Sequence, residues 1–325
     1  MDNRFLDEKR TLEESRDAYI KEFDKRYSEL AKSIADDIDK WFDKYASNEQ
    51  ITNEEAYQLL SKREQRNWSM TLDEYRKKAI EGGYTQELNA EYYKSRISRA
   101  EQLMNQLRFE LTDYSQEEVD RLNEYLKEHF EESYLRNLYE LSDRGSFSVD
   151  FNRYNSTQLQ MVIRKPWKGS TFFDRLSENI TGRLPDSLTK VFTQGIVNGW
   201  SIDKMTDALM KEVTLTTRNR IKTLIRTESA HLAEQASQVA YKQTKVKKWK
   251  WLATLETSTC SLCGKLDGQI FDTYDKDAPS IPLHPNCRCT SVPVVEGFEN
   301  KERHSQDGFV KDMTFEEWKK QKLDL

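Results

Sequence analysis

The sequence has no proline before Pro166, no cysteine before Cys260 and no glycine before Gly82. Because proline and glycine interrupt helices, their absence leaves the first part of the chain free of the residues that most often end one. Long apolar runs are also missing, whereas a membrane-spanning helix needs about 20 consecutive apolar residues. The opening segment MDNRFLDEKR lacks the apolar core of a signal peptide. We therefore expect a soluble protein that is made and folded in a cytoplasm.

Apolar residues make up 36% of the 325-residue chain and charged residues make up 33%. A compact globular domain usually contains about 45–50% apolar residues. The length suggests roughly two domains. A low apolar share combined with many charges of both signs favours long, partly solvated helices over one thick core.

The two parts of the chain differ in charge. Residues 1–150 contain 35 Asp and Glu against 24 Lys and Arg, a net charge of −11. Residues 151–325 contain the remaining 21 acidic residues against 27 basic ones, a net charge of +6. The formal charge of −5 therefore hides an acidic first part and a basic second part, an asymmetry that bears on partners rather than on fold.

Residues 1–150 are predicted to be helical almost throughout. Good helix formers dominate, and apolar residues recur at spacings of three and four over residues 19–42 and 88–111. Capping boxes at Thr52, Thr71 and Ser115, each with a Glu three residues later, predict helix starts. We expect an acidic helical arm or bundle over this region.

The pattern changes after residue 146. Apolar and polar residues alternate over residues 147–163, which predicts short strands or an extended linker ending at Pro166. Helical patterns then return, with Ser201 as the N-cap of a helix over residues 202–212 and a long helix over residues 218–244. Gly182–Pro185 is expected to separate two of these helices.

The residues after the long helix predict a small sheet. Residues 246–255 are rich in aromatic and β-branched side chains, and Asp267-Gly268 provides a turn before residues 269–271, so a β-hairpin is expected. The predicted fold class is mainly α, with an N-terminal extended helical region followed by an α+β C-terminal domain that carries a small β-hairpin and a zinc-knuckle-like site. The predicted regions are 1–150 (helical arm), 151–169 (linker), 170–295 (C-terminal domain) and 296–325 (tail with a short helix over 314–320).

All four cysteines lie in two short motifs, Cys260-Ser-Leu-Cys263 and His284-Pro-Asn-Cys287-Arg-Cys289. A C-x2-C pair followed by H-x2-C has ligand spacing for a structural zinc ion, because each pair places two ligands on one tight turn. Gly264 suits the bend of such a turn. The predicted cofactor is therefore a structural Zn²⁺ that pins the hairpin to the proline-rich segment 279–288.

Five candidate ligands compete for four places. Cys260, Cys263 and Cys287 fill three of them, and the fourth is either Cys289 or His284, which we favour from the symmetry of the two pairs. A disulfide pair and a redox-active C-x-x-C are the alternatives, and neither the expected compartment nor a βαβ pattern favours them. A catalytic zinc keeps one position open to water, so a surplus of ligands indicates a closed site.

Positive charge gathers over residues 218–250. The candidate nucleic-acid contacts are Arg218, Arg220, Lys222, Lys245, Lys247, Lys248 and Lys250. Trp249 and Trp251 lie between the lysines and offer a surface on which bases could stack. The alternative interpretation is a solvated helix face followed by an edge strand that lysines protect from pairing.

Arg226-Thr227-Glu228 falls inside the predicted long helix. Two residues that are two apart do not share a helix face, so Arg226 and Glu228 are expected to contact different neighbours. We favour a structural role for this pair over a catalytic one.

Four segments together resemble the phage Mu F-like minor head proteins, also called head morphogenesis proteins of tailed bacteriophages. They are Ile225–Glu228, Trp251–Thr254, Thr259–Gly268 and Leu283–Cys289, and the resemblance covers about residues 170–295. It implies a low-copy virion protein inside the head near the portal, acting in head morphogenesis and in DNA packaging or ejection, and present in the host cytoplasm before assembly. The family's metal-type motif falls on the four cysteines and His284, and its RTE signature falls on Arg226 and Glu228.

The resemblance also implies partners and leaves two enzymatic alternatives. The expected partner is the portal protein, and further candidates are a scaffold protein, the major capsid protein and double-stranded DNA. A zinc-containing nuclease would need a histidine free to activate water, but His284 is already claimed by the metal motif. An ADP-ribosyltransferase-like domain would need Ser-Thr-Ser or Glu-x-Glu elements that we do not find. No residue is therefore assigned a catalytic role, and a non-enzyme is expected.

Overall fold

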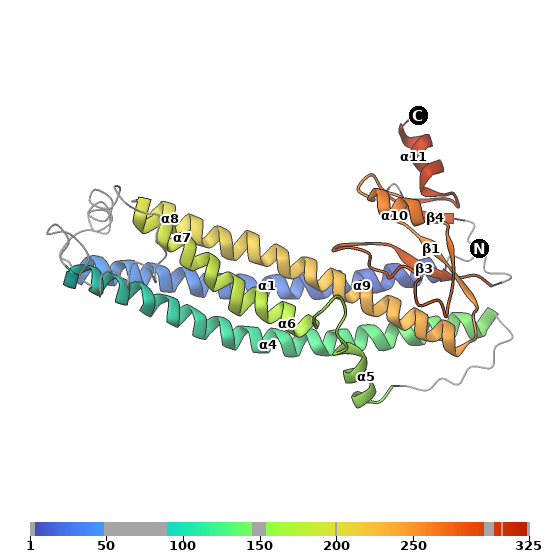
Figure 1. The fold of residues 1–325 in the computed structure, drawn as a ribbon, viewed down its shortest axis with the longest axis horizontal. Coiled ribbons are helices and arrows are strands. Elements are labelled where there is room, and N and C mark those ends of the chain that lie inside the picture. The colour runs from blue at the N-terminus through green and yellow to red at the C-terminus, as the bar shows by residue number, and fades with distance from the viewer. Residues whose placement is uncertain are drawn as a thin grey trace. The chain divides into compact units, whose positions relative to one another are not determined.

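The computed structural model describes residues 4–48, 90–144, 154–198, 200–295, 302–306 and 308–323 (Figure 1). The helices are α1 (Arg4–Asn48), α4 (Ala90–Arg144), α5 (Ser156–Ile163), α6 (Phe172–Ser177), α7 (Leu184–Asn198), α8 (Ile202–Lys211), α9 (Arg218–Gln243), α10 (Ser261–Leu266) and α11 (Phe315–Leu323), with π-helical turns η1 (Glu178–Arg183) and η2 (Glu212–Thr217). The strands are β1 (Lys248–Leu252), β2 (Ile270–Asp272), β3 (Thr290–Pro293), β4 (Glu302–Ser305) and β5 (Gly308–Lys311). The prediction of a mainly α fold with a small antiparallel sheet in its C-terminal part is confirmed.

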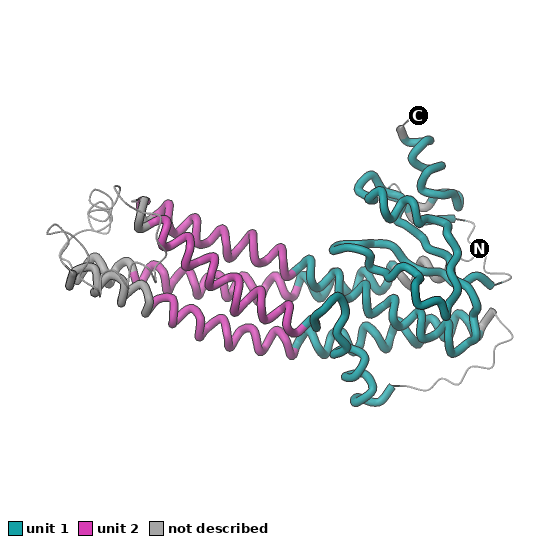
Figure 2. The backbone as a smooth tube through the Cα atoms, in the orientation of Figure 1, with its two compact units in different colours: residues 1–21, 121–172, 222–325 teal, residues 22–120, 173–221 magenta. Residues whose placement is uncertain are grey.

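The described chain forms two compact units, coloured separately in Figure 2. Unit 1 comprises residues 1–21, 121–172 and 222–325, and unit 2 comprises residues 22–120 and 173–221. Each unit is therefore built from segments that are far apart in the sequence, and α1, α4 and α9 contribute to both. The four regions expected from the sequence are each one continuous stretch of chain, unlike these two units. That division into domains remains a prediction. No helix in the described part of the chain is long and apolar enough to cross a membrane.

Unit 2 is a helical unit with an apolar interior. The stripe predicted on the first helix is confirmed, since Leu30, Ile34 and Ile38 of α1 are buried. Trp41 of α1 packs edge-on against Phe192 of α7, with ring centroids 5.1 Å apart. The prediction that Ser201 caps the following helix is also confirmed, because its hydroxyl accepts a hydrogen bond from the Lys204 amide.

The helix start predicted at Ser115 is wrong, because α4 continues through this position. Ser115 and Glu118 are both buried, so their side chains serve the interior of the unit and not a helix end. The Glu118 carboxylate accepts from the Arg26 guanidinium of α1, with Nη2 to Oε2 at 3.0 Å. The capping boxes at Thr52 and Thr71 lie outside the described residues.

The strands or linker predicted over residues 147–163 are wrong for the described part, which forms α5. Asn155 and Gln158 make a capping box: the Asn155 side chain accepts from the Gln158 amide, and the Gln158 side chain accepts from the Asn155 amide. Leu159 and Ile163, four residues apart, are buried, whereas Met161 is 71% exposed. The apparent alternation is thus one face of a helix. The earlier apolar residues of this pattern lie outside the described residues.

Gly182–Pro185 does not separate two helices, because α6, η1 and α7 follow one another without a break. In η1 the backbone hydrogen bonds change from the α-helical to the π-helical pattern. The Leu184 amide donates to the carbonyl of Asn179, five residues earlier. Pro185 has no N–H to donate. A change of hydrogen-bond register at this point lets the helix absorb the proline.

The three-stranded sheet of unit 1 has the order β2-β1-β3, with both pairs antiparallel. The expected pairing of β1 with residues 269–271 is confirmed, with Trp249 opposite Phe271, although α10 lies between the two strands. Trp249 and Trp251 are buried, and the Trp249 ring lies 4.9 Å from that of Phe271. The prediction that these tryptophans form a stacking surface for nucleic-acid bases is therefore wrong.

A buried ion pair joins the turn before β2 to the chain end. Both carboxylate oxygens of Asp267 accept from the Arg303 guanidinium of β4, at 2.7 Å and 2.9 Å. The same carboxylate accepts from the amides of Ala253 (2.8 Å) and Phe315 (2.6 Å). One side chain therefore connects β1, β4 and α11.

The helix predicted over residues 314–320 is confirmed as α11, and its capping box consists of Thr314 and Glu317. Its first residue, Phe315, packs directly on Gly264 of α10: a Cβ added to Gly264 would lie 2.5 Å from a ring carbon. Gly264 lies inside the helix α10. A glycine is thus required at position 264 because the Phe315 ring packs against it. The prediction that Gly264 provides a bend is wrong, since it lies within a helix.

Asp267→Asn should lower the free energy of unfolding by about 3 kcal/mol, because it removes the buried counter-charge of the Arg303 guanidinium and leaves only Asp312, at 3.9 Å. Urea unfolding followed by tryptophan fluorescence measures the change. Asp277→Asn is the matched control, since its exposed carboxylate has no hydrogen-bond partner among the described residues. It should change the stability by less than about 0.5 kcal/mol. Equal effects of the two variants would contradict a special role for Asp267.

Candidate metal centre

The first pair of candidate ligands lies at the start of α10. Cys260 is the N-cap residue, with extended backbone angles, and its Sγ accepts from the Cys263 amide at 3.4 Å. Burial acts to raise the pKa of the Cys260 thiol, but hydrogen bonds from Cys263 and the Leu262 amide lower it overall. A helix start thus favours the thiolate, the form that binds a metal.

The second group lies in the segment between the sheet strands, where Asn286 turns the chain. Its φ of 58° falls in the left-handed region, which asparagine tolerates better than most residues. This turn brings His284 and Cys287 to the α10 cysteines. His284 Nε2 lies 3.3 Å from both Cys260 Sγ and Cys263 Sγ, and Cys287 Sγ lies 3.8 Å from Cys263 Sγ.

All five predicted ligands come together as two overlapping triads. One triad is Cys260, Cys263 and His284, and the other is Cys263, Cys287 and Cys289; within each, the donor atoms lie within 4.8 Å of one another. Cys263 belongs to both triads and is buried. The structure therefore brings both candidates for the fourth place, His284 and Cys289, to the centre, and the choice between them remains a prediction.

The donor atoms fit a zinc ion. With Zn–S bonds of about 2.3 Å, the thiolates of a tetrahedral site lie about 3.8 Å apart, which matches the separation of Cys263 Sγ and Cys287 Sγ. His284 Nδ1 lies 2.8 Å from the Pro285 carbonyl. A carbonyl can only accept, so Nδ1 carries the hydrogen and the Nε2 lone pair faces the thiols, as a metal-binding histidine requires.

The thiols of the centre share their protons through hydrogen bonds. Those with Cys263 and Cys289 lower the pKa of Cys287, whereas those with Cys287 and Cys289 raise the pKa of Cys263. All four cysteines are free thiols, and the 3.8 Å separation is far from the S–S bond of about 2.05 Å. A bound ion would displace the remaining thiol protons, so its affinity would rise with pH.

Helix α9 contacts the metal-binding segment, residues 284–289, through two threonines. The Asn286 amide donates to Thr227 Oγ1 at 3.2 Å, and its side-chain amide donates to Thr223 Oγ1 at 3.3 Å. On the other side, Lys168 Nζ donates to the Leu283 carbonyl at 2.8 Å. These contacts fix the path of the chain on both sides of His284, and no local pattern in the sequence indicated them.

Arg226 and Glu228 contact different surroundings, in line with their spacing. Glu228 is buried and accepts from the Trp167 indole N–H at 2.7 Å, and the same indole stacks on His231 with ring centroids 4.1 Å apart. Arg226 instead lines a pocket beside the cysteines. The two side chains do not converge on one site, which does not favour an ADP-ribosyl transfer centre built from this pair.

The structure does not bring the predicted nucleic-acid contacts together as one cluster. Arg218 and Arg220 lie in the first turn of α9, whereas Lys245, Lys247 and Lys248 follow its C-terminal end and are exposed. Two members are paired with carboxylates, Arg218 with Asp24 at 2.8 Å and Lys250 with Asp312 at 3.8 Å. Lys222, one turn beyond Arg218, is half-buried. DNA contact by these residues remains a prediction.

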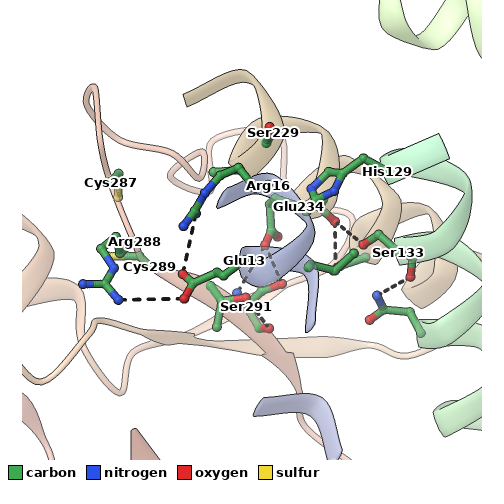
Figure 3. Close-up of a pocket in the computed structure, with 16 residues that line it drawn as sticks. Glu13, Arg16, His129, Ser133, Ser229, Glu234, Cys287, Arg288, Cys289 and Ser291 are labelled. Carbon is green, nitrogen blue, oxygen red and sulfur yellow. Dashed lines mark hydrogen bonds and ion pairs between the residues drawn. The ribbon is translucent and has the colours of Figure 1, made fainter. Parts of the chain in front are cut away.

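A polar pocket behind the metal-binding segment was missed in the sequence (Figure 3). Its volume is about 70 Å³, room for a few water molecules. Glu234 of α9 accepts from the Ser291 amide and hydroxyl, at 3.2 Å and 2.9 Å. Glu13 of α1 lies 3.8 Å from the Arg288 guanidinium. These partners are distant in sequence, so only the folded chain reveals them.

His129 of α4 lines the same pocket and has partners that its sequence context did not reveal. Its Nδ1 lies 3.3 Å from the Tyr125 hydroxyl. Burial lowers the pKa of His129 from its usual value of 6.5 to about 4. The ring is therefore neutral at physiological pH.

Comparison with known proteins places this site in a family. Residues 186–292 match the family described as "Phage Mu protein F like protein". The match covers about a third of the chain. The matched region contains the RTE segment, all four cysteines and His284. The resemblance predicted from the motifs is thus confirmed for this region.

Three curated relatives extend the comparison. The minor head protein GP7 of Bacillus phage SPP1 is 25% identical over 224 residues, which cover 62% of this chain and 71% of that protein. An uncharacterized protein of Haemophilus influenzae is 26% identical over 50% of this chain and 36% of its own length. The NAD(+)–arginine ADP-ribosyltransferase EFV of Enterococcus faecalis is 23% identical over 60% of this chain and 43% of its own length. This chain thus spans less than half the length of two of these relatives. No solved structure shows a significant match.

Cys263→Ser in the Mu F-like centre should weaken zinc binding by more than about 100-fold, since Cys263 belongs to both triads. His284→Ala should also weaken binding, whereas Cys289→Ser should leave it nearly unchanged if His284 is the fourth ligand. Competition titrations with a zinc chelator measure the affinity. Absorption of the Co²⁺-substituted protein reports how many thiolates remain bound. If Cys289→Ser weakened zinc binding more than His284→Ala did, the fourth ligand would be Cys289.

The pH dependence of stability should carry a contribution from His129. Its pKa of about 4 in the folded chain lies below the unfolded value of 6.5, so the unfolded chain binds the extra proton first. The contribution is therefore complete above pH 6.5 and is lost as the pH falls toward 4, by about 3 kcal/mol at most. Urea unfolding at pH 7, 5.5 and 4.5 measures it. His129→Gln should flatten this slope, and an unchanged slope would contradict the assignment.

Proposed function

We propose that this chain acts as a minor head protein bound inside the phage head near the portal, where it takes part in head morphogenesis and in DNA packaging or ejection. The match of residues 186–292 to the Mu F-like family and the similarity to a minor head protein over 71% of that protein's length support the proposal. The portal protein is the proposed partner, with a scaffold or the major capsid protein as further candidates. Double-stranded DNA is proposed as a weaker contact of the exposed lysines after α9.

The charge distribution supports contacts of two kinds. The acidic region 1–150 carries a net charge of −11, so it is repelled by packaged DNA and is suited to contacting a protein ring. The basic region 151–325 carries a net charge of +6 and includes the metal centre. We propose that Zn²⁺, bound by three of the cysteines and His284, supplies folding free energy to this region and takes no part in a reaction.

The side chains of the metal centre favour a structural role over a nuclease. A nuclease of the His-metal type requires a histidine that can accept a proton from water. Both nitrogens of His284 are engaged, Nδ1 with the Pro285 carbonyl and Nε2 with the two α10 thiols. A metal bound there would occupy the same Nε2 lone pair. The ring is thus suited to ligation and not to base catalysis.

Portal binding is tested by co-expressing the full chain with the portal protein encoded in the same genome. We expect the two to co-elute in size-exclusion chromatography, and image reconstruction of the complex would locate the chain on the ring. The major capsid protein, co-expressed in the same way, is the comparison. Co-elution with the capsid protein but not with the portal protein would contradict the proposed location.

The absence of nuclease activity is tested with supercoiled plasmid and Mg²⁺. We expect the zinc-loaded chain and its His284→Ala variant to leave the plasmid equally intact, because His284 is engaged as a ligand. Gel electrophoresis over several hours measures the nicked fraction. Cleavage that requires Mg²⁺ and is lost in His284→Ala would overturn the structural interpretation.

A further inference from the structure

A pocket of about 600 Å³ opens beside the metal centre within unit 1. Its walls come from α1, α9, Cys263 of α10, residues 254–260 and residues 284–289, and thus include all five candidate metal ligands. This volume is within the range of about 300–1,000 Å³ in which proteins bind small ligands or inserted side chains. The pocket contains three arginines and three carboxylates: Arg16, Arg226, Arg288, Glu13, Asp17 and Glu256.

All but one of these charged side chains are paired. Arg16 donates to the Asp17 carboxylate at 3.0 Å and lies 3.8 Å from Glu13. Arg288 donates to the Glu256 carboxylate at 2.7 Å. These two arginines and three carboxylates are therefore paired along the wall, with one negative charge in excess.

Arg226 is the exception. Among the residues that the structure describes, its guanidinium has no hydrogen-bond or ion-pair partner, although the side chain is half-buried. A guanidinium carries five N–H donors, and removing a charge from water without a partner is costly. A free, partly desolvated arginine in a pocket is thus prepared to receive an anion.

The backbone around Arg226 is fixed in advance. The next two residues of α9 are both engaged, Thr227 with the Asn286 amide and Glu228 with the Trp167 indole. Glu228 cannot swing back to neutralise Arg226, because residues two apart point to different sides of a helix. A binding group held on a rigid element loses little conformational entropy when its ligand arrives.

We propose that Arg226 makes this pocket a binding site for a single carboxylate, supplied by an acidic side chain of a partner protein. A guanidinium binds a carboxylate through two parallel hydrogen bonds. The three carboxylates in the wall repel a polyanion such as the DNA backbone. A single acidic side chain of a partner carries only one negative charge, and the amide groups next to it in the partner are neutral. This inference rests on the proposed function only in that a head protein has protein partners.

The test uses the full, zinc-loaded chain with ¹⁵N-labelled arginine side chains and N-acetyl-glutamate amide as the probe. We expect one Nε–H resonance to shift saturably with the probe. That resonance should be absent in Arg226→Gln, which assigns it, and probe affinity in this variant should fall at least about tenfold. Arg220→Gln is the matched control, since Arg220 is an exposed arginine on the same helix, and it should bind the probe normally. Unchanged zinc content and melting temperature in both variants exclude misfolding.

Three results would overturn the proposal. Inorganic phosphate or a short DNA duplex could shift the Arg226 resonance more than the glutamate probe does, which would make the pocket a phosphate site. The resonance could respond to zinc loading and not to the probe, which would make Arg226 part of the metal centre. The probe could also bind Arg226→Gln as well as the unaltered chain. Failure of portal co-elution with probe binding intact would instead count against the proposed location alone.

Discussion

The basic part of the chain depends on the meeting of two thiol-bearing turns around Cys263. Cys263 is shared by both ligand triads, and its sulfur contacts His284 Nε2 and Cys287 Sγ at 3.3 Å and 3.8 Å. Contacts from other parts of unit 1 fix each of these turns. Phe315 and the N-cap position fix the first turn, and Thr227 with Lys168 fixes the second. The small sheet alone offers few strands and little core, so a shared ion is an effective way to stabilise it.

The RTE segment and the cysteine motifs form one structural system. Thr227, the middle residue, accepts a hydrogen bond from the segment that carries His284 and Cys287, and Glu228 holds the indole next to Lys168. Lys168 in turn donates to the chain just before His284. The co-occurrence of these motifs in order along the sequence thus has a physical reason, because a change in either would move the other.

Much of this could be predicted from the sequence because the signals were local. Ligand spacing identified all five residues of the centre, apolar periodicity identified α1 and α9, and the N-cap residue Ser201 identified α8. Local signals failed where a neighbour distant in the chain decided the outcome. Ser115 and Glu118 have the pattern of a helix start, but the Glu118 carboxylate accepts a hydrogen bond from Arg26 of another helix. Trp249 is flanked by lysines in the sequence, but its ring packs against Phe271. The partners of Asp267 and Glu13 are of the same kind, because no spacing rule connects Asp267 with Arg303 or Glu13 with Arg288.

The composition of unit 1 has a consequence for synthesis. Its segments 1–21 and 222–325 are separated along the chain by residues 22–221. Glu13 of α1 lies 3.8 Å from the Arg288 guanidinium, so this contact cannot form until Arg288 has been synthesised. Contacts of such large sequence separation slow folding. The side of α1 that meets the metal-binding segment therefore gains these partners late in synthesis.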